Sequence, residues 1–324
     1  MATKGISKRW IAVVALALVI GGYGVAGTFY KQALYDGAMG LEASLSGLEE
    51  KQVDISIGNI SYYDNGQVDK PKVLLVHGFA AYKENWVRFA RSFKDQYHVV
   101  AVDLPGHGKS VSDIQLDYSL TNQVAWLHEF IQKMGWAQFH MAGNSMGGAI
   151  TAVYAATHPE QILTATLLDP AGVHKYRSVM QDLIDEGRNP LVVNNHDDFK
   201  RLMDFALEQP PFIPWPITVV SAERAQALKP VHDKLWFDMS REQDSGFQDL
   251  LPKIQAPTLV QWGDQDRVLN YKNAEVFKAL IPNAQVHIWP NIGHAPMIEI
   301  PSDSAELMLS HLAGRLSNVA SVAE

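Results

Sequence analysis

The sequence predicts an α/β protein with a mostly parallel, doubly wound sheet, an inserted helical cap and a hydrophobic helix at the N-terminus. Short continuous apolar runs, typical of buried parallel strands, alternate along the chain with helix-compatible stretches. The alternation stops between residues 171 and 251, where helical pieces and a cluster of prolines and aromatic residues replace the buried strands. At the other end, residues 10–30 carry no charge.

The N-terminal segment has the length of a membrane span. About 20 apolar residues cross a bilayer as a helix, and residues 10–30 join a strongly apolar half to a glycine-rich half. Lys4, Lys8 and Arg9 precede the segment, so the positive-inside rule leaves residues 1–9 in the cytoplasm. We therefore expect a single-pass membrane protein with its catalytic domain on the non-cytoplasmic side, periplasmic in a bacterium. The alternatives are a cleaved signal peptide, which implies secretion, and a buried core helix.

The remaining elements follow from the apolar pattern in chain order. Alternation over 53–63 indicates a strand or hairpin, with Asn65-Gly66 as a turn. Buried strands are predicted over 72–76, 98–102, 138–142, 162–168, 258–262 and 285–289. Helices are predicted over 86–93, 119–134, 148–156, 273–280 and 302–316. The predicted organisation is a connector at 31–52, the first half of the core at 53–170, the cap at 171–251, the second half of the core at 252–318 and a tail at 319–324.

The composition narrows the class of partner. The formal net charge is -8, which disfavours a nucleic-acid surface, and the chain has no cysteine, which excludes disulfides and thiolate metal sites. The sequence contains neither the phosphate-binding pattern G-x-x-x-x-G-K-[ST] nor a G-x-G-x-x-G that leads a βαβ unit. We therefore expect a small-molecule substrate, no cofactor, no metal and no nucleic acid, and a membrane contact through residues 10–30. The oligomeric state stays open.

The stretch from Gly143 to Gly147 carries the strongest chemical signal. It reads G-N-S-M-G, follows a predicted strand and precedes a predicted helix. A serine on a tight strand-to-helix turn exposes its hydroxyl, and flanking glycines let the strand and helix approach each other. The helix N-terminus also points amide groups at charge that develops beside this serine. Ser145 is therefore the candidate nucleophile.

A serine nucleophile needs a base and a group that orients the base. Among 12 histidines, His294 lies in a loop after the last predicted strand, where open α/β sheets gather their sites. Asp266 is our choice of acid, although Asp264 and Asp169 also follow strands and are open alternatives. His77 and His107, in tight turns nearby, are interpreted as structural.

The predicted site also needs donors for an oxyanion and a pocket for substrate. The backbone N–H groups of Met146 and Phe79 are the candidate donors, because one follows the nucleophile and the other lies after the first buried strand. Apolar cap residues are candidates for an acyl pocket, although for any one of them taken alone a place in the cap's own core is favoured. The substrate-binding candidates are Phe212, Ile213 and Trp215, together with Phe205 and Trp236.

Several motifs together resemble the α/β-hydrolase-fold serine hydrolases over residues 53–316. They lie at 77–79, 103–108, 143–148, 263–268 and 293–294. Residues 75–86, 169–172 and 262–269, with the N-terminal segment, resemble the membrane-anchored monoacylglycerol lipases and related bacterial lipases. The resemblance implies a triad of Ser145, Asp266 and His294, which stand here in the family's chain order, and it favours Asp266 over Asp169.

The expected activity is hydrolysis of a carboxylic ester, a mono- or short-chain acylglycerol, through an acyl-enzyme on Ser145. Residues 143–148 also resemble the serine hydrolases that cleave carbon–carbon bonds in vinylogous diketones. A general small-ester hydrolase of the same fold is a further alternative. A non-catalytic binding protein on this fold is the alternative from another class.

Overall fold

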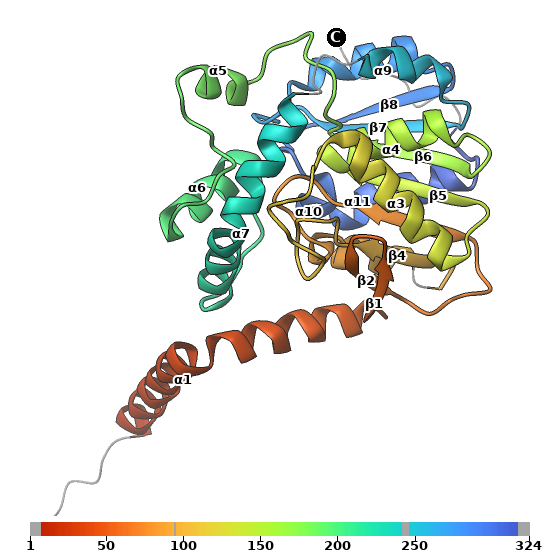
Figure 1. Ribbon diagram of the computed structural model, residues 1–324. Coiled ribbons are helices and arrows are strands. Elements are labelled where there is room, and N and C mark those ends of the chain that lie inside the picture. Colours follow the sequence, from red (N-terminus) through yellow and green to blue (C-terminus); the bar gives the residue numbers. More distant parts are fainter. Residues whose placement is uncertain (1–7, 94, 242–245, 317–324) are drawn as a thin grey trace, which may run out of the picture.

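One twisted sheet forms the centre of the computed structural model, which describes residues 8–93, 95–241 and 246–316 (Figure 1). Its strand order is β1-β2-β4-β3-β5-β6-β7-β8. The hairpin β1–β2 and the pair β2–β4 are antiparallel, and the pairs from β4 through β8 are parallel. The strands are β1 Glu49–Ile55, β2 Gly58–Asp64, β3 Lys72–Val76, β4 His98–Val102, β5 Phe139–Asn144, β6 Ile162–Leu168, β7 Thr258–Gly263 and β8 Ala284–Trp289.

Helices cover both faces of this sheet and enclose two hydrophobic cores. One core lies under α3 (Leu120–Met134), α4 (Met146–Thr157) and α9 (Ala274–Leu280), and the other lies under α2 (Val87–Ala90), α10 (Pro296–Glu299) and α11 (Pro301–Leu312). Strands β3 and β4 are buried almost throughout, as continuous apolar runs predict for parallel strands covered on both faces. Short 3₁₀ turns complete the framework at η1 Lys83–Trp86, η2 Arg91–Phe93, η3 Leu251–Lys253 and η4 Tyr271–Asn273.

Further helices stand between β6 and β7 in the chain and lie at one end of the sheet (Figure 1). They are α5 Val179–Asp185, α6 His196–Ala206, α7 Ile217–Ser240 and α8 Phe247–Leu250. Side-chain caps begin α5 and α6, where Ser178 and Asn195 accept backbone N–H groups of the first turn. Helix α7 reaches the carboxyl end of the sheet, where its Trp236 packs against Phe79 of the loop after β3.

The N-terminal helix α1 (Lys8–Leu45) bends at Tyr30, and its second arm packs against the body (Figure 1). Arg224 of α7 donates to the hydroxyl of Tyr35, and Arg88 pairs with Glu42 at 2.6 Å. Nearer the bend, a Cβ atom on Gly27 would lie 2.1 Å from the ring of Trp215. The helix therefore contacts both the sheet layer and the inserted helices.

The predicted membrane span is wrong. In the part of the chain that the structure describes, no helix combines the length and apolar character needed to cross a bilayer. The four glycines in the second half of residues 10–30 lower its apolar content, and the helix bends at Tyr30 into the charged arm that holds Lys31. The predicted single-pass anchor and the non-cytoplasmic catalytic domain are therefore withdrawn. Most of the predicted terminus 1–9 and all of the tail 319–324 lie outside the described residues.

The structure adds detail to two local predictions. The first part of the connector 31–52 continues α1, and its last part begins β1 at Glu49. The hairpin turns at Ser56-Ile57, before Gly58 with a φ of 130°, and not at Asn65-Gly66. Asn65 and Gly66 instead lie after β2, where Asp64 accepts the N–H of Gly66 at 2.7 Å.

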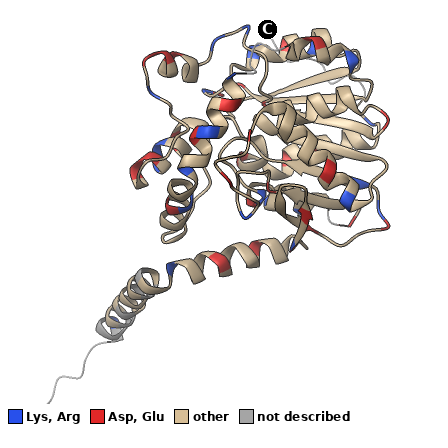
Figure 2. Cartoon of the chain, viewed as in Figure 1, with Lys and Arg blue, Asp and Glu red and all other residues tan. Residues whose placement is uncertain are grey.

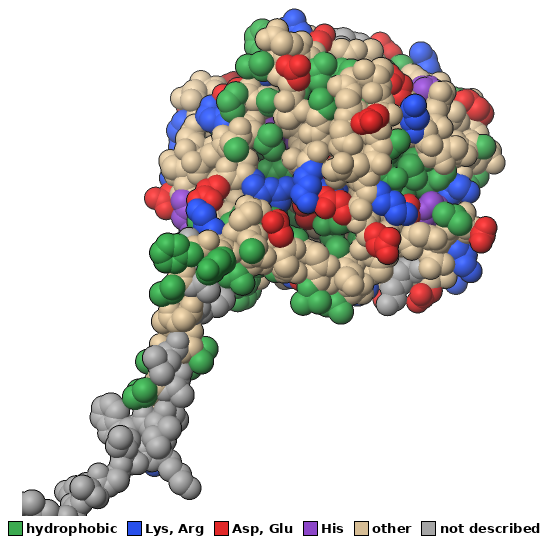
Figure 3. Space-filling view, turned by 60° about the horizontal axis from the view of Figure 1, so that its bottom comes forward, with side chains coloured by type: hydrophobic (Ala, Val, Ile, Leu, Met, Phe, Trp, Pro, Cys, Tyr) green, Lys and Arg blue, Asp and Glu red, His purple; other side chains and the backbone are tan. Residues whose placement is uncertain are grey.

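Surface charges and exposed apolar side chains are distributed differently. Positive and negative side chains of the described residues are interspersed in the view of Figure 2. Hydrophobic side chains gather where the first arm of α1 meets the body (Figure 3). Phe29 and Tyr30, at the bend of α1, are largely exposed, and so is Phe212 of the loop before α7.

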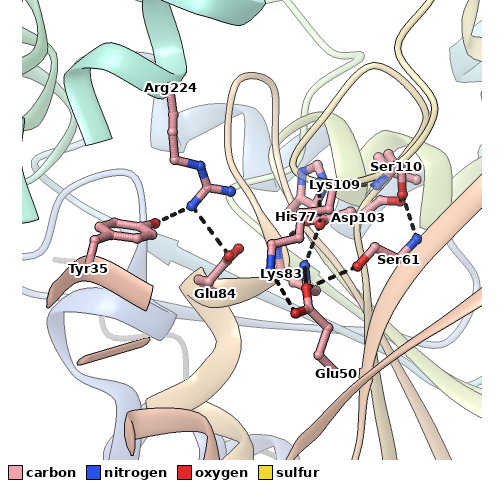
Figure 4. A network of polar contacts seen from close by, with 11 residues as sticks. Tyr35, Glu50, Ser61, His77, Lys83, Glu84, Asp103, Lys109, Ser110 and Arg224 are labelled. Atoms are coloured by element: carbon pink, nitrogen blue, oxygen red, sulfur yellow. Dashed lines mark hydrogen bonds and ion pairs between the residues drawn. The ribbon is translucent and has the colours of Figure 1, made fainter. Parts of the chain in front are cut away.

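A polar network joins the hairpin to the body beside α1 (Figure 4). Lys83 is fully buried, and its ammonium lies 2.6 Å from a carboxylate oxygen of Asp103 and 3.0 Å from one of Glu50. Asp103 also accepts the backbone N–H groups of Lys83 and Lys109, and Lys109 pairs with Glu50 at 2.7 Å. The network fixes the loop after β4, which lies beside the loop after β3.

Replacing Lys83 with methionine is expected to lower the free energy of unfolding by about 3–5 kcal/mol, because it leaves the buried Asp103 carboxylate without its countercharge. Urea denaturation followed by circular dichroism measures this change. Lys229→Met is the matched control, since Lys229 forms a partly exposed pair with Asp233 on α7 and its loss should cost about 0–1 kcal/mol. Equal effects of the two substitutions would contradict the prediction.

Candidate active site

Ser145 occupies a strained turn between β5 and α4. Its φ is 55° and its ψ is −116°, a conformation that L residues rarely adopt. The turn closes because Gly143 and Gly147 have no side chains: a Cβ on Gly143 would lie 2.0 Å from the carbonyl oxygen of Gly147. The Ser145 hydroxyl does not cap α4, so it is not engaged by the helix that it precedes. The sequence motif therefore forms the predicted turn, with the serine at its apex.

His294 and Asp266 meet after the last two strands. Nδ1 of His294 lies 2.7 Å from Oδ2 of Asp266, and both side chains are nearly or fully buried. Because the carboxylate accepts from Nδ1, Nε2 is the ring nitrogen left for another partner. Ser145 and the Asp266 loop residues Val268 and Leu269 line a common cavity. The structure thus pairs His294 with Asp266 and places the loop of Asp266 on the same cavity as Ser145, and the triad itself stays a prediction.

The carboxylate of Asp266 is held by its surroundings on both oxygens. Oδ1 accepts the backbone N–H groups of Val268 (2.8 Å) and Leu269 (2.9 Å), and Oδ2 also accepts Nε1–H of Trp262 (2.9 Å). Asp264, the alternative in the same loop, accepts the N–H of Asn291 at 2.7 Å instead. Its side chain therefore shapes the loop and does not pair with His294.

The third candidate acid, Asp169, lies close to the pair. One atom each from the carboxyls of Asp169 and Asp266 and from the imidazole of His294 fall within 4.8 Å of one another. Three such groups could hold a metal ion in principle. Here His294 Nδ1 and three further N–H groups already donate to Asp266, an arrangement that suits an orienting carboxylate. We identify no residues that would hold a cofactor in the described part of the chain.

Two side chains that the sequence did not single out tie the histidine loop to its neighbours. Nδ2 of Asn144 donates to the carbonyl oxygens of His294 (3.0 Å) and Leu168 (3.2 Å). The carboxylate of Glu299 accepts the N–H groups of Gly293, Glu208 and Gln209. Asn144 lies inside the serine motif, so the sequence could have indicated a role for it near the nucleophile. Nothing in the sequence indicates such a role for Glu299.

Asn144→Ala is expected to lower kcat by about 10- to 100-fold, because it frees the His294 loop from the serine turn and a small misplacement of catalytic groups costs that much. Steady-state kinetics on a p-nitrophenyl ester would measure the effect. Asn283→Ala is the matched control, since Asn283 also donates to a backbone carbonyl but is exposed and distant in the fold. An unchanged kcat in Asn144→Ala would refute the positioning role.

The loop after β3 lies against the serine turn. A Cβ on Gly78 would lie 3.1 Å from Cβ of Ser145, so the backbone of this loop comes into contact with the nucleophile. Ala80 has a φ of 54°, which turns the chain sharply after Phe79. The N–H of Met146 belongs to the first turn of α4, where no preceding carbonyl is available to it. Both predicted oxyanion donors therefore come from backbone that adjoins Ser145.

Two buried histidines hold these loops in place, in agreement with their structural interpretation. Nε2 of His77 accepts the N–H of Leu104 at 3.0 Å, and Nε2 of His107 accepts the N–H of Ala80 at 3.2 Å. Burial lowers the pKa of His77 to about 4, so its ring is neutral at pH 7 and can accept this hydrogen bond. Burial also lowers the pKa of His107 well below its usual value.

A cavity of about 130 Å³ opens beside Ser145. The ring of Phe79 forms one wall and packs against Trp236 of α7, with ring centroids 5.4 Å apart. Other lining side chains are mostly apolar: Leu120, Met146, Met180, Leu191, Met239, Phe247, Val268 and Leu269. The cavity therefore offers an apolar surface to a substrate bound at Ser145.

The three predicted substrate-binding residues do not line this cavity. Phe212 is 87% exposed, and Trp215 packs against Gly27 of α1. Ile213 is likewise absent from the lining, while Trp236 of the same predicted cluster is present. Trp215 of the proline-rich segment faces α1, and Trp236 and Met239 of the long helix α7 supply the cavity wall instead.

The strand order, the serine turn and the histidine–aspartate pair define a class of protein, the α/β-hydrolases. The sequence profile of the alpha/beta hydrolase fold matches residues 71–301, and this chain belongs to that family.

Two relatives are similar to this chain in sequence, and one solved structure is similar to it in fold. The chain is 36% identical over 270 residues to Lipase 3 of Moraxella sp. (strain TA144), covering 82% of this chain and 84% of that one. It is 34% identical over 260 residues to monoacylglycerol lipase abhd6-B of Xenopus laevis, covering 76% of each. The crystal structure of a membrane phospholipase A, described as a bacterial virulence factor, superposes with a TM-score of 0.87 at 38% identity, covering 95% of this chain and 99% of that one.

Proposed function

We propose that this protein is a lipase-like carboxylic ester hydrolase that acts on acylglycerols through an acyl-enzyme on Ser145. The observation that carries the proposal is the short contact between His294 and Asp266 beside a serine turn, in a chain at least 33% identical to two bacterial lipases. Monoacylglycerol lipases among the relatives favour acylglycerols as the substrate class.

The proposed reaction begins with proton transfer. Nε2 of His294 takes the proton of the Ser145 hydroxyl as its oxygen attacks the ester carbonyl carbon. Asp266 accepts the Nδ1–H group, which fixes the tautomer and stabilises the imidazolium that forms. The N–H groups of Phe79 and Met146 donate to the carbonyl oxygen as it becomes negatively charged.

Breakdown of the tetrahedral intermediate releases the alcohol. His294 Nε2–H protonates the leaving alkoxide, and the acyl group stays on Ser145 as an ester. Water then attacks that ester while His294 takes its proton, and the carboxylic acid leaves with Ser145 restored. The apolar cavity walls formed by Trp236, Met239 and Phe247 are proposed to hold the acyl chain, because burying its methylene groups is favourable by about 0.8 kcal/mol each.

A substrate panel tests the proposal. Monoacylglycerols and p-nitrophenyl esters of graded chain length, a diacyl phospholipid and a vinylogous diketone acid would be compared, with Ser145→Ala as the blank. We expect a higher kcat/KM for the lipid esters than for p-nitrophenyl acetate, the shortest ester of the series, or for the diketone acid. Equal or better turnover of the diketone would overturn the assignment in favour of carbon–carbon cleavage. Turnover restricted to short soluble esters would overturn the lipid part alone.

Ser302→Ala is the matched control for the blank, because Ser302 is an exposed serine of α11 outside the proposed site. It should hydrolyse every substrate like the unaltered protein.

A further inference from the structure

Asp169 presents a fully buried carboxyl that the proposed reaction does not use. It follows β6 with a φ of 45°, and its Oδ1 accepts the N–H of Gly263 at 3.0 Å. Its Oδ2 is buried and has no hydrogen-bond partner among the described residues. Buried polar atoms are rarely left in this state, so the second oxygen calls for an explanation.

The neighbours of Asp169 supply one. Its carboxyl lies within 4.8 Å of the interacting atoms of both Asp266 and His294. Burial, and after it the charge of Asp266, raises the pKa of Asp169 well above its usual range. Two carboxyls this close in a buried site cannot both carry charge at low cost, so Asp169 is the member of the pair that keeps its proton.

We propose that Asp169 is a reserve acid for His294: it takes no part in the reaction while Asp266 orients the imidazole, and it takes over that role when the Asp266 carboxylate is lost. Asp266 carries the charge in the intact protein because four N–H groups donate to it, whereas Asp169 Oδ1 accepts one. When the charge of Asp266 is removed, Asp169 loses its proton to solvent. It then accepts Nδ1–H of His294 through its unpartnered oxygen.

A double-mutant cycle tests this inference, which rests on the proposed function because it concerns the same base. Asp169→Asn alone should leave kcat nearly unchanged, since the amide oxygen can still accept the N–H of Gly263. Asp266→Ala alone should lower kcat by about 10²-fold, the effect of an imperfectly placed group. The double variant should lose about 10⁴-fold, as expected when the imidazole has no carboxylate to orient it.

The loss of activity in the double variant should appear in kcat, with KM unchanged, because Asp169 acts on His294 and not on the bound ester. A merely structural Asp169 would instead give the same factor for Asp169→Asn in both backgrounds. Equal activity of Asp266→Ala and of the double variant would overturn the inference.

Asp266→Ser provides a second background if the alanine variant does not fold, because its hydroxyl can still accept from Val268 and Leu269. In the Asp266→Ser background, Asp169→Asn should again lower kcat by a larger factor than it does in the unaltered protein. Equal factors in the two backgrounds would overturn the inference. Failure of the proposed function is seen separately, as absence of ester hydrolysis in the unaltered protein or its persistence in Ser145→Ala.

Discussion

Replacing Ser145 with alanine is expected to lower kcat for ester hydrolysis by about 10⁶-fold, which leaves only what binding and the oxyanion donors provide. His294→Ala should cost a similar factor, because a serine hydroxyl without its base is a weak nucleophile. The double variant should be no slower than either single one, since the two residues act as one unit. Steady-state kinetics with a p-nitrophenyl ester, together with labelling by a fluorophosphonate, measures all three.

The control for the histidine is His196→Ala, because His196 is an exposed residue at the start of α6 and lies outside the cavity. It should keep full activity. Additive losses in the double variant would show that Ser145 and His294 do not act together.

Gly143→Ala is expected to destabilise the fold by more than about 4 kcal/mol, or to prevent folding altogether. The added Cβ would lie 2.0 Å from the carbonyl oxygen of Gly147 and 2.5 Å from Oγ1 of Thr151. Neither the backbone of α4 nor a fully buried threonine can move aside easily. The yield of soluble protein and the urea midpoint measure the effect.

Gly37→Ala is the matched control for this substitution. A Cβ on Gly37 has no neighbour within 4 Å, and the residue lies inside helix α1. Its replacement should stabilise the protein slightly, by up to about 1 kcal/mol, because alanine is the better helix former. A urea midpoint of Gly143→Ala that equals that of the control would mean that the turn is looser than the structure describes.

The fold was predictable because its parallel strands are covered on both faces. Burial on both faces produces the continuous apolar runs at 72–76 and 98–102, which turns and helices then separate. The edge hairpin was harder, since β1 begins with Glu49, Glu50 and Lys51, whose side chains face solvent or the polar network. Its turn also lacks the expected Asn-Gly pair.

Residues placed by local geometry were easier to predict than residues placed by distant contacts. The serine turn depends on glycines within its own motif, and the Asp266 loop depends on its own backbone N–H groups. The direction of Trp215 depends instead on α1, far away in the chain. The prediction of a membrane span was wrong because only the first half of residues 10–30 is strongly apolar. The second half is rich in glycine, which contributes little apolar surface.

The helices inserted between β6 and β7 delay completion of the sheet during translation. Strand β6 pairs with β7 in the finished sheet, but synthesis of the chain from Leu168 to Thr258 takes roughly 5–18 s at ordinary translation rates. During that interval β6 is an open edge, which can pair with another strand. His294 is added later still, long after Ser145. The nascent chain therefore passes through a stage that can aggregate before it reaches one that can hydrolyse an ester.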